Sequence, residues 1–120
     1  MTEARQSLGR VGEELAARYL ERRGCAILAR NHRTPLGELD LIARDRSHLL
    51  FVEVKTRRSC AFGAPAEAVD VRKQRQVVRA AQWYLARCRH PDLQPRFDVI
   101  AVLIGRGEPA ITHIPNAFGV

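Results

Sequence analysis

The chain has 120 residues, enough for one domain with a hydrophobic core and too few for two. Its hydrophobic content of 46% is that of an ordinary globular protein, and no apolar run in the sequence approaches the roughly 18 residues that a membrane span requires. The formal charge of +7 favours a polyanionic partner, for which nucleic acid is the first candidate, and no membrane partner is expected.

The cysteines and the first residues indicate the compartment. Cys25, Cys60 and Cys88 are odd in number and lack the paired spacing of a disulfide framework or a zinc site. The first ten residues, MTEARQSLGR, lack the apolar core of a secretory signal. We therefore expect a cytoplasmic protein in which residues 1–120 form a single domain.

Residues 3–23 predict an amphipathic helix that ends at Gly24. Its two adjacent acids differ in position. Glu13 lies at the edge of the apolar stripe and points toward the body of the protein, whereas Glu14 lies on the outer surface, where an ion pair with Arg18 explains it. The stripe consists of Leu8, Val11, Leu15, Ala16, Tyr19 and Leu20.

Three strands are predicted next, over residues 25–30, 39–43 and 49–55, with turns at 31–36 and 44–47. Joined by short turns, they form an antiparallel meander. In the third strand, LLFVEVK, side chains alternate between the two faces of the sheet. Phe51, Glu53 and Lys55 therefore share one face, and Val52 and Val54 share the other.

The second half of the chain predicts a crossover. After a loop at residues 57–65, Asp70 is a suitable N-cap for a helix over residues 71–89. Its inner face carries Gln74, Val77, Val78, Ala81, Tyr84 and Leu85. The apolar run at 96–104 follows as a buried strand parallel to 51–55, then a short strand at 110–114 and a tail. The predicted fold is α/β, with a mixed central sheet of about five strands flanked by two long helices.

The acids of the meander predict a metal site. Asp40 and Glu53 lie on neighbouring strands, and two close carboxylates repel each other unless a cation lies between them. Mg²⁺ takes oxygen ligands and keeps several waters, so the two carboxylates and the backbone carbonyl of Val54 suit it. Lys55, on the face of Glu53, would stabilise the developing charge of a scissile phosphate. These groups are typical of a metal-dependent phosphodiesterase.

Each of these residues also has a purely structural explanation. Glu53 and Lys55 could form an ion pair on an exposed edge, and Asp40 could mark a solvent-facing position of an alternating strand. Glu13 could be a surface acid near the start of a helix, where the dipole favours it. If all of these explanations held, the four residues would have to converge by accident, so the metal site is favoured.

Several short motifs carry a resemblance to a known family. They are Asn31, GELD at 37–40, FVEVKTR at 51–57, Lys73-Gln74 at the start of a helix, RFDVIAV at 96–102 and NAF at 116–118. With these motifs the chain resembles the YraN-like family, which is similar to the archaeal Holliday-junction resolvases of the restriction-endonuclease-like (PD-(D/E)XK) superfamily. The resemblance implies a restriction-endonuclease-like fold.

The resemblance also implies roles for single residues. The metal-binding acids of the family fall on Asp40 and Glu53, its catalytic lysine on Lys55 and its helix glutamate on Glu13, where the Gly9-to-Glu13 pattern is loose. Gln74 falls where related nucleases keep a glutamine near the site. Leu39 stands where the superfamily usually has proline.

The predicted function is that of a Mg²⁺-dependent (or Mn²⁺-dependent) DNA endonuclease, and the resemblance suggests branched or structured DNA as its substrate. Basic residues around the site are the candidates for backbone contacts: Arg57, Arg58, Arg72, Lys73 and Arg75. A homodimer is expected only by analogy with junction cutting, which requires two active sites. Two alternatives stay open, a non-catalytic nucleic-acid-binding scaffold and an interaction module whose charged pairs are structural.

Overall fold

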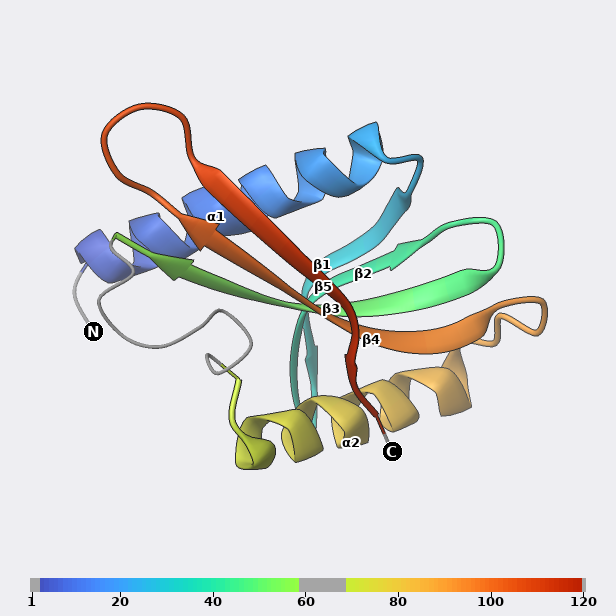
Figure 1. Cartoon of the computed structure of the whole chain (residues 1–120). Coiled ribbons are helices and arrows are strands. Elements are labelled where there is room, and N and C mark those ends of the chain that lie inside the picture. The colour runs from blue at the N-terminus through green and yellow to red at the C-terminus, as the bar shows by residue number, and fades with distance from the viewer. Residues whose placement is uncertain (1–2, 59–68, 120) are drawn as a thin grey trace.

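The computed structural model of the protein describes residues 3–58 and 69–119 (Figure 1). Its elements follow one another in the order α1 (Glu3–Arg22), β1 (Ala26–Thr34), β2 (Gly37–Arg44), β3 (His48–Arg57), α2 (Val71–Arg87), β4 (Gln94–Leu103) and β5 (Ala110–Phe118). Most of the predicted loop at 57–65, including Cys60, lies outside the described residues. In the described part of the chain, neither helix has the length and apolar character needed to cross a membrane.

The five strands form one mixed sheet in the order β1-β2-β3-β4-β5. Neighbouring strands are antiparallel, except that β4 lies parallel to β3 with Phe51 opposite Phe97 and Lys55 opposite Ala101. Helix α2 connects these two parallel strands, which is the crossover that the sequence predicts. The predicted α/β class, with its mixed sheet and two long helices, is therefore confirmed.

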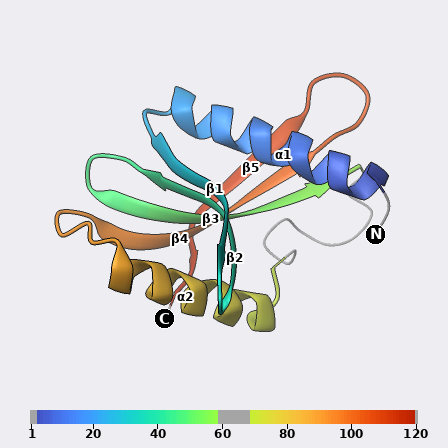
Figure 2. The same ribbon diagram turned by 180° about the vertical axis from the view of Figure 1, so that it is seen from behind.

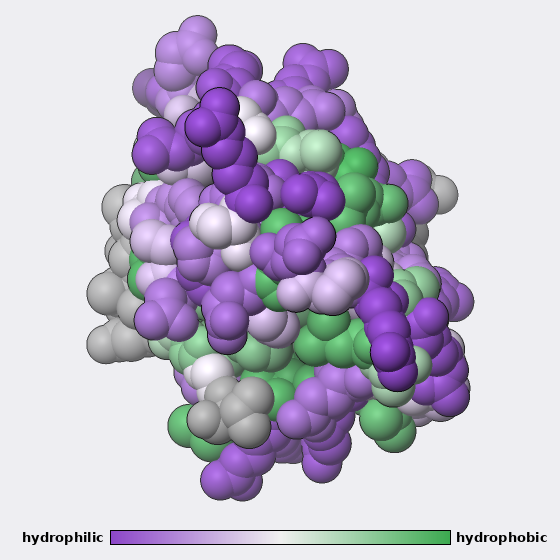
Figure 3. Space-filling view, turned by 90° about the vertical axis from the view of Figure 1, so that its right-hand side faces the viewer, coloured by the Kyte–Doolittle hydropathy of each residue, from purple (hydrophilic) through white to green (hydrophobic). Residues whose placement is uncertain are grey.

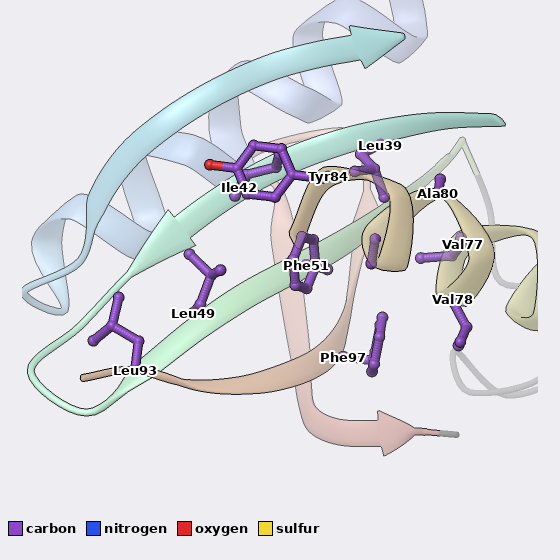
Figure 4. Close-up of a cluster of buried hydrophobic side chains, with 11 residues drawn as sticks. Leu39, Ile42, Leu49, Phe51, Val77, Val78, Ala80, Tyr84, Leu93 and Phe97 are labelled. Atoms are coloured by element: carbon purple, nitrogen blue, oxygen red, sulfur yellow. The ribbon is translucent and has the colours of Figure 1, made fainter. Parts of the chain in front are cut away.

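The two helices cover opposite faces of the sheet (Figures 1 and 2). Phe51 packs on the α2 side together with Val77 and Tyr84, and Figure 4 shows this cluster. Val52 and Val54 pack on the α1 side with side chains of that helix. The predicted alternation along β3 is confirmed, and it places Glu53 on the α2 side.

Helix α1 ends where the sequence indicates. Gly24 has a φ of +92°, its N–H donates to the Glu21 carbonyl, and the N–H of Cys25 donates to the Leu20 carbonyl. This is the Schellman arrangement, which favours glycine at the left-handed position. It turns the chain into β1 at the edge of the sheet.

Helix α1 packs on the sheet along the predicted stripe, of which Ala16 and Leu20 are fully buried and Leu15 and Tyr19 pack against the same core. Gly12, Ala16 and Ala17 are buried, and a Cβ on Gly12 would overlap the side chain of Thr56. Val11, predicted to be part of the stripe, is 49% exposed. The prediction for Val11 is wrong because the close approach at Gly12 rotates its larger neighbour out to the rim.

Several element boundaries also differ from the prediction, among them those of β1, β5 and α2. Strand β1 continues to Thr34, because the turn needs only Pro35 and Leu36, and Thr34 Oγ1 closes it by donating to the Gly37 carbonyl. Strand β5 continues past 114 to Phe118, by way of a register shift and a left-handed φ of 52° at Asn116. Helix α2 ends at Arg87 instead of residue 89.

Candidate metal and nucleic-acid site

The site begins where β2 separates from β3. Their regular pairing runs from Arg44 opposite Leu49 to Leu41 opposite Val52. At the next position, the Oδ2 of Asp40 accepts a hydrogen bond of 2.9 Å from the N–H of Val54. The carboxylate thus occupies the position that a backbone carbonyl of β2 would take, which fixes Asp40 beside the end of β3.

Asp40 and Glu53 form a pair of acids in which Asp40 is half-buried and Glu53 is buried. Glu53 is only 3% exposed. Burial, and then the charge of Asp40, raises the pKa of Glu53 to about 8. Burial also raises the pKa of Asp40, although the Val54 N–H opposes the change. Their mutual hydrogen bond raises the pKa of Glu53 and lowers that of Asp40, so a proton shared by the two carboxyl groups resides mainly on Glu53.

Lys73 is the cation that the structure places at this pair. Its Nζ lies 3.6 Å from a carboxylate oxygen of Glu53. The residue lies in the first turn of α2, where the Asp70 side chain accepts the N–H of Lys73 at 2.8 Å and caps the helix. Sequence reasoning assigned Lys73 to phosphate contacts and did not predict this ion pair. The N-cap at Asp70 was the available signal, because it fixes where the first turn lies.

Glu13 reaches the same region from α1. It is half-buried, and burial followed by the charge of Asp40 raises its pKa, while a hydrogen bond with the Asn31 side chain lowers it in part. Asn31 has a left-handed φ of 49° in β1. The structure therefore brings Glu13 within electrostatic range of Asp40 without placing it in the carboxyl pair.

Glu14 differs from Glu13 as the sequence predicts. Its carboxylate accepts from Arg18 at 3.2 Å and also pairs with Arg30 of β1 on the exposed surface. Hydrogen bonds from Arg30 and Arg18 lower the pKa of Glu14. Ion pairs with these two arginines therefore explain the presence of Glu14 on the surface.

A cleft of about 520 Å³ opens between α1 and the end of β3. Its lining includes Leu8, Gly9, Glu13, Val54, Lys55 and Arg57. Lys55 and Arg57 are the basic groups in this cleft, and Glu13 faces them from the helix. The cleft therefore joins the predicted lysine and the predicted helix glutamate in one space.

Gln74 and the outer arginines lie elsewhere. The Nε2 of Gln74 donates to the Val69 carbonyl at 3.0 Å, and the residue lines a hollow with Val71 and Arg75. None of its described contacts reaches Asp40 or Glu53. Lys73, the residue before it, takes the place near the carboxylates that was predicted for Gln74. Arg58, Arg72 and Arg75 are exposed.

The donor set suits a cation that keeps much of its water. Among the described residues, no three His, Cys, Asp or Glu side chains gather closely enough to hold a metal ion. Two carboxylates and a backbone carbonyl are what this place offers. The N–H of Val54 points toward β2, and the carbonyl of the same strand residue points to the same side. Mg²⁺ accepts such a partial protein shell, because it binds through one or two carboxylates and several waters.

Asp98 is a second acid of interest, and the sequence predicted it only as part of a strand. Asp98 is fully buried, and it accepts from Arg96 at 2.9 and 2.8 Å, from His113 at 2.8 Å and from the N–H of Asn116 at 3.0 Å. Burial alone would raise its pKa, but these hydrogen bonds lower the pKa to about 2. The other ring nitrogen of His113 contacts the Tyr19 hydroxyl at 3.3 Å. The network ties β5 to β4 and to α1.

Comparison with known proteins places the chain in a family. The profile described as "Uncharacterised protein family UPF0102" matches residues 12–102. A UPF0102 protein of Syntrophotalea carbinolica is 59% identical over 120 residues, which is 100% of this chain and 98% of that protein. One of Anaeromyxobacter dehalogenans is 52% identical over 119 residues, 97% of this chain and 87% of the relative. One of Caldanaerobacter subterraneus subsp. tengcongensis is 44% identical over 117 residues, 95% of this chain and 96% of the relative.

The matched span contains Asp40, Glu53 and every residue that lines the cleft apart from Leu8 and Gly9. The similarity also extends over nearly the full length of these relatives. The chain therefore belongs to the UPF0102 family, as its resemblance to YraN-like proteins predicts.

Proposed function

We propose that the protein is a Mg²⁺-dependent (or Mn²⁺-dependent) DNA endonuclease of the restriction-endonuclease-like kind. The observation that carries the proposal is the juxtaposition of half-buried Asp40 and buried Glu53 where β2 leaves β3. Two acids held so close together with little access to water are costly for the fold. Function is the simplest reason to keep them, especially with Lys55 and Lys73 beside them.

Asp40, Glu53 and the Val54 carbonyl are the groups that would hold the cation. When bound, it supplies positive charge for the phosphate oxygens and lowers the pKa of nearby water. The proton shared by the two acids has to leave before both can bind a cation, so affinity should rise with pH.

The remaining residues act on the phosphodiester and the water. Lys55 lies in the cleft, where its ammonium can orient the attacking water and stabilise negative charge on the phosphate. Glu13 faces the same cleft and would hold water by hydrogen bonds. Lys73 can leave Glu53 for a phosphate oxygen, because a polyanion offers its ammonium an equivalent partner.

Arg57 lies in the cleft, Arg58, Arg72 and Arg75 are exposed, and all four would contact the nucleic-acid backbone. The resemblance to junction resolvases supports branched or structured DNA as the substrate. Cutting both strands of a junction requires two sites, so a homodimer follows if that substrate is the correct one.

One observation favours a second candidate, a nucleic-acid-binding scaffold without catalysis. Lys73 already compensates part of the charge on Glu53, and the shared proton compensates more. A cluster neutralised in this way can persist in a protein that binds no metal. The scaffold predicts the same basic surface but no cleavage.

The test is a cleavage panel on linear, nicked, flapped and four-way DNA with Mg²⁺ or Mn²⁺. The nuclease predicts cleavage of at least one substrate by the wild type and none by Asp40→Asn or in the presence of EDTA. Binding without metal-dependent cleavage of any DNA in the panel would favour the scaffold.

A further inference from the structure

Helix α2 carries most of the excess positive charge of the protein. Arg72, Lys73, Arg75, Arg79 and Arg87 give it a formal charge of +5, and it contains no acidic residue. The whole chain has a charge of +7, so only +2 remains for all the other residues together. A charge excess concentrated on one helix is a directed surface rather than a general property of the composition.

The arginines of α2 lie on its outer face. The buried residues Val77, Val78, Ala81 and Tyr84 define the face that packs on the sheet. At 100° per residue, Arg79 lies opposite the centre of that face, and Arg72 and Arg75 lie within about 40° of Arg79. All three are exposed, and within the described residues none of them forms an ion pair.

A fourth exposed arginine, Arg87, lies at the end of the helix, turned about 80° from Arg79 around the helix axis. The guanidinium of Arg87 lies 3.8 Å from the ring centroid of Trp83, so the ring holds it at the surface. From Arg72 to Arg87 the helix rises by about 22 Å. In Figure 1, α2 runs from the side of the molecule on which β3 ends toward the opposite side. Figure 3 views the molecule from that opposite side, where many hydrophilic side chains project.

We propose that the outer face of α2 binds the phosphate backbone of a duplex DNA arm that leads away from the carboxylate site. This inference rests on the proposed function, because Lys73 at the start of α2 contacts Glu53 and so joins the helix to that site. A length of about 22 Å corresponds to about six or seven base pairs at 3.4 Å each. The substrate therefore needs a duplex arm of at least that length next to the cut.

Nucleic acid fits this face better than an anionic membrane does. Guanidinium groups match phosphate geometry, and between the arginines the face presents Gln76, Gln82 and Ala86. A helix that lies in a membrane interface needs large apolar residues opposite its basic ones. Here the residues opposite the arginines are buried against the sheet. Val71, which is 58% exposed, is the one large apolar side chain of α2 that is exposed.

The experiment measures binding of the full-length protein to DNA junctions whose arms are about 4, 8 or 12 base pairs long, in EDTA so that no cleavage occurs. The test variant is Arg79→Gln with Arg87→Gln, neither of which belongs to the predicted site. The control is Arg22→Gln with Arg106→Gln, two exposed arginines at the end of α1 and in the loop between β4 and β5, away from α2 (Figures 1 and 2). Circular dichroism checks that both variants are folded.

For the wild type, we expect affinity to rise between 4 and 8 base pairs and to level off beyond. The test variant should lose that rise, and the slope of log affinity against log salt should flatten by about two units, since each phosphate contact contributes about 0.9. The control should keep the rise with arm length. Equal losses in both variants, or no dependence on arm length in the wild type, would overturn the proposal.

Two further outcomes distinguish this proposal from a membrane-binding surface and from the proposed nuclease activity. If vesicles of phosphatidylserine bind the wild type more tightly than DNA does, and only the test variant loses this binding, the face is a membrane surface and the proposal is wrong. A protein that shows the arm-length effect but never cleaves DNA would refute the nuclease and leave the binding surface standing.

Discussion

The Nζ of Lys73 lies 3.6 Å from a carboxylate oxygen of Glu53, although the two residues belong to α2 and β3. Glu53 is buried, so this ammonium is a large part of what compensates its charge. The contact links the start of the basic helix to the pair of acids. We therefore expect a substitution at the start of α2 to affect the pair of acids, and a substitution in the pair to affect the start of α2.

Replacing Lys73 with methionine should raise the pKa of Glu53 above its value of about 8, because the positive charge of Lys73 lowers that pKa. A carbon NMR titration of the Glu53 carboxyl group measures this directly. Arg72→Met is the matched control, since Arg72 is the exposed neighbour and has no described contact with Glu53. An unchanged titration midpoint in Lys73→Met would show that the ion pair does not form in solution.

Asp40→Asn should abolish Mg²⁺ binding in calorimetry and stabilise the metal-free protein at high pH. The pKa of Glu53 is raised in the folded state, so the stability that Glu53 contributes is present below about pH 4.5 and is lost as the pH rises through about 8. Asparagine removes the charge of Asp40 that contributes to this loss, and its amide oxygen can still accept the Val54 N–H.

The free energy of unfolding of Asp40→Asn should therefore exceed that of the wild type at pH 8 in EDTA, and the two values should converge toward pH 4. Urea unfolding at several pH values provides the measurement. Unchanged Mg²⁺ affinity in this variant would exclude the proposed site.

The two glutamates of α1 should respond differently to the same substitution. Glu13→Gln should weaken cleavage or metal affinity, because Glu13 faces the cleft and interacts with Asp40. Glu14→Gln removes only exposed ion pairs with Arg18 and Arg30 and should leave both properties unchanged. Metal titrations and cleavage rates of the two variants give the comparison. A larger effect at Glu14 would contradict the assignment.

Asp98→Asn should destabilise the fold by about 2 to 4 kcal/mol at pH 7, since it leaves buried donors without their anion. The pKa of Asp98 is lowered to about 2, so its contribution is present above about pH 4 and is lost as the pH falls through about 2. The difference from the wild type in urea unfolding should therefore shrink in acid. Asp92→Asn, at an exposed aspartate, is the control and should change little.

Much of the fold could be predicted because strand alternation and helix ends are determined by local sequence patterns. Alternation in FVEVK assigned Phe51 and Glu53 to one face and Val52 to the other, and Gly24 and Asp70 marked the helix ends. The parallel placement of β4 followed from the helix between it and β3. Each of these predictions depends only on residues close together in the chain.

The errors and omissions involve contacts between distant residues. Val11 was predicted to be buried because helical periodicity cannot show that Gly12 meets Thr56. The network of Asp98 joins residues of β4 and β5 with Tyr19 of α1, and no single motif contains them. The ion pair of Lys73 with Glu53 depends on how α2 crosses the sheet. Whether Asp40 and Glu53 meet depends on the register of their two strands, and the sequence could predict their convergence only if that register held.

The central claim concerns chemistry rather than binding, and Lys55→Ala tests it most directly. The paired measurement is gel-shift affinity across a salt series and single-turnover cleavage with Mg²⁺, both on the same structured DNA. Because Lys55 lies in the cleft beside Glu13, we expect the variant to bind DNA within roughly threefold of the wild type while its cleavage rate falls by about two to four orders of magnitude. A wild type that cleaves nothing, together with a Lys55→Ala variant that loses affinity as an outer arginine variant does, would contradict the nuclease.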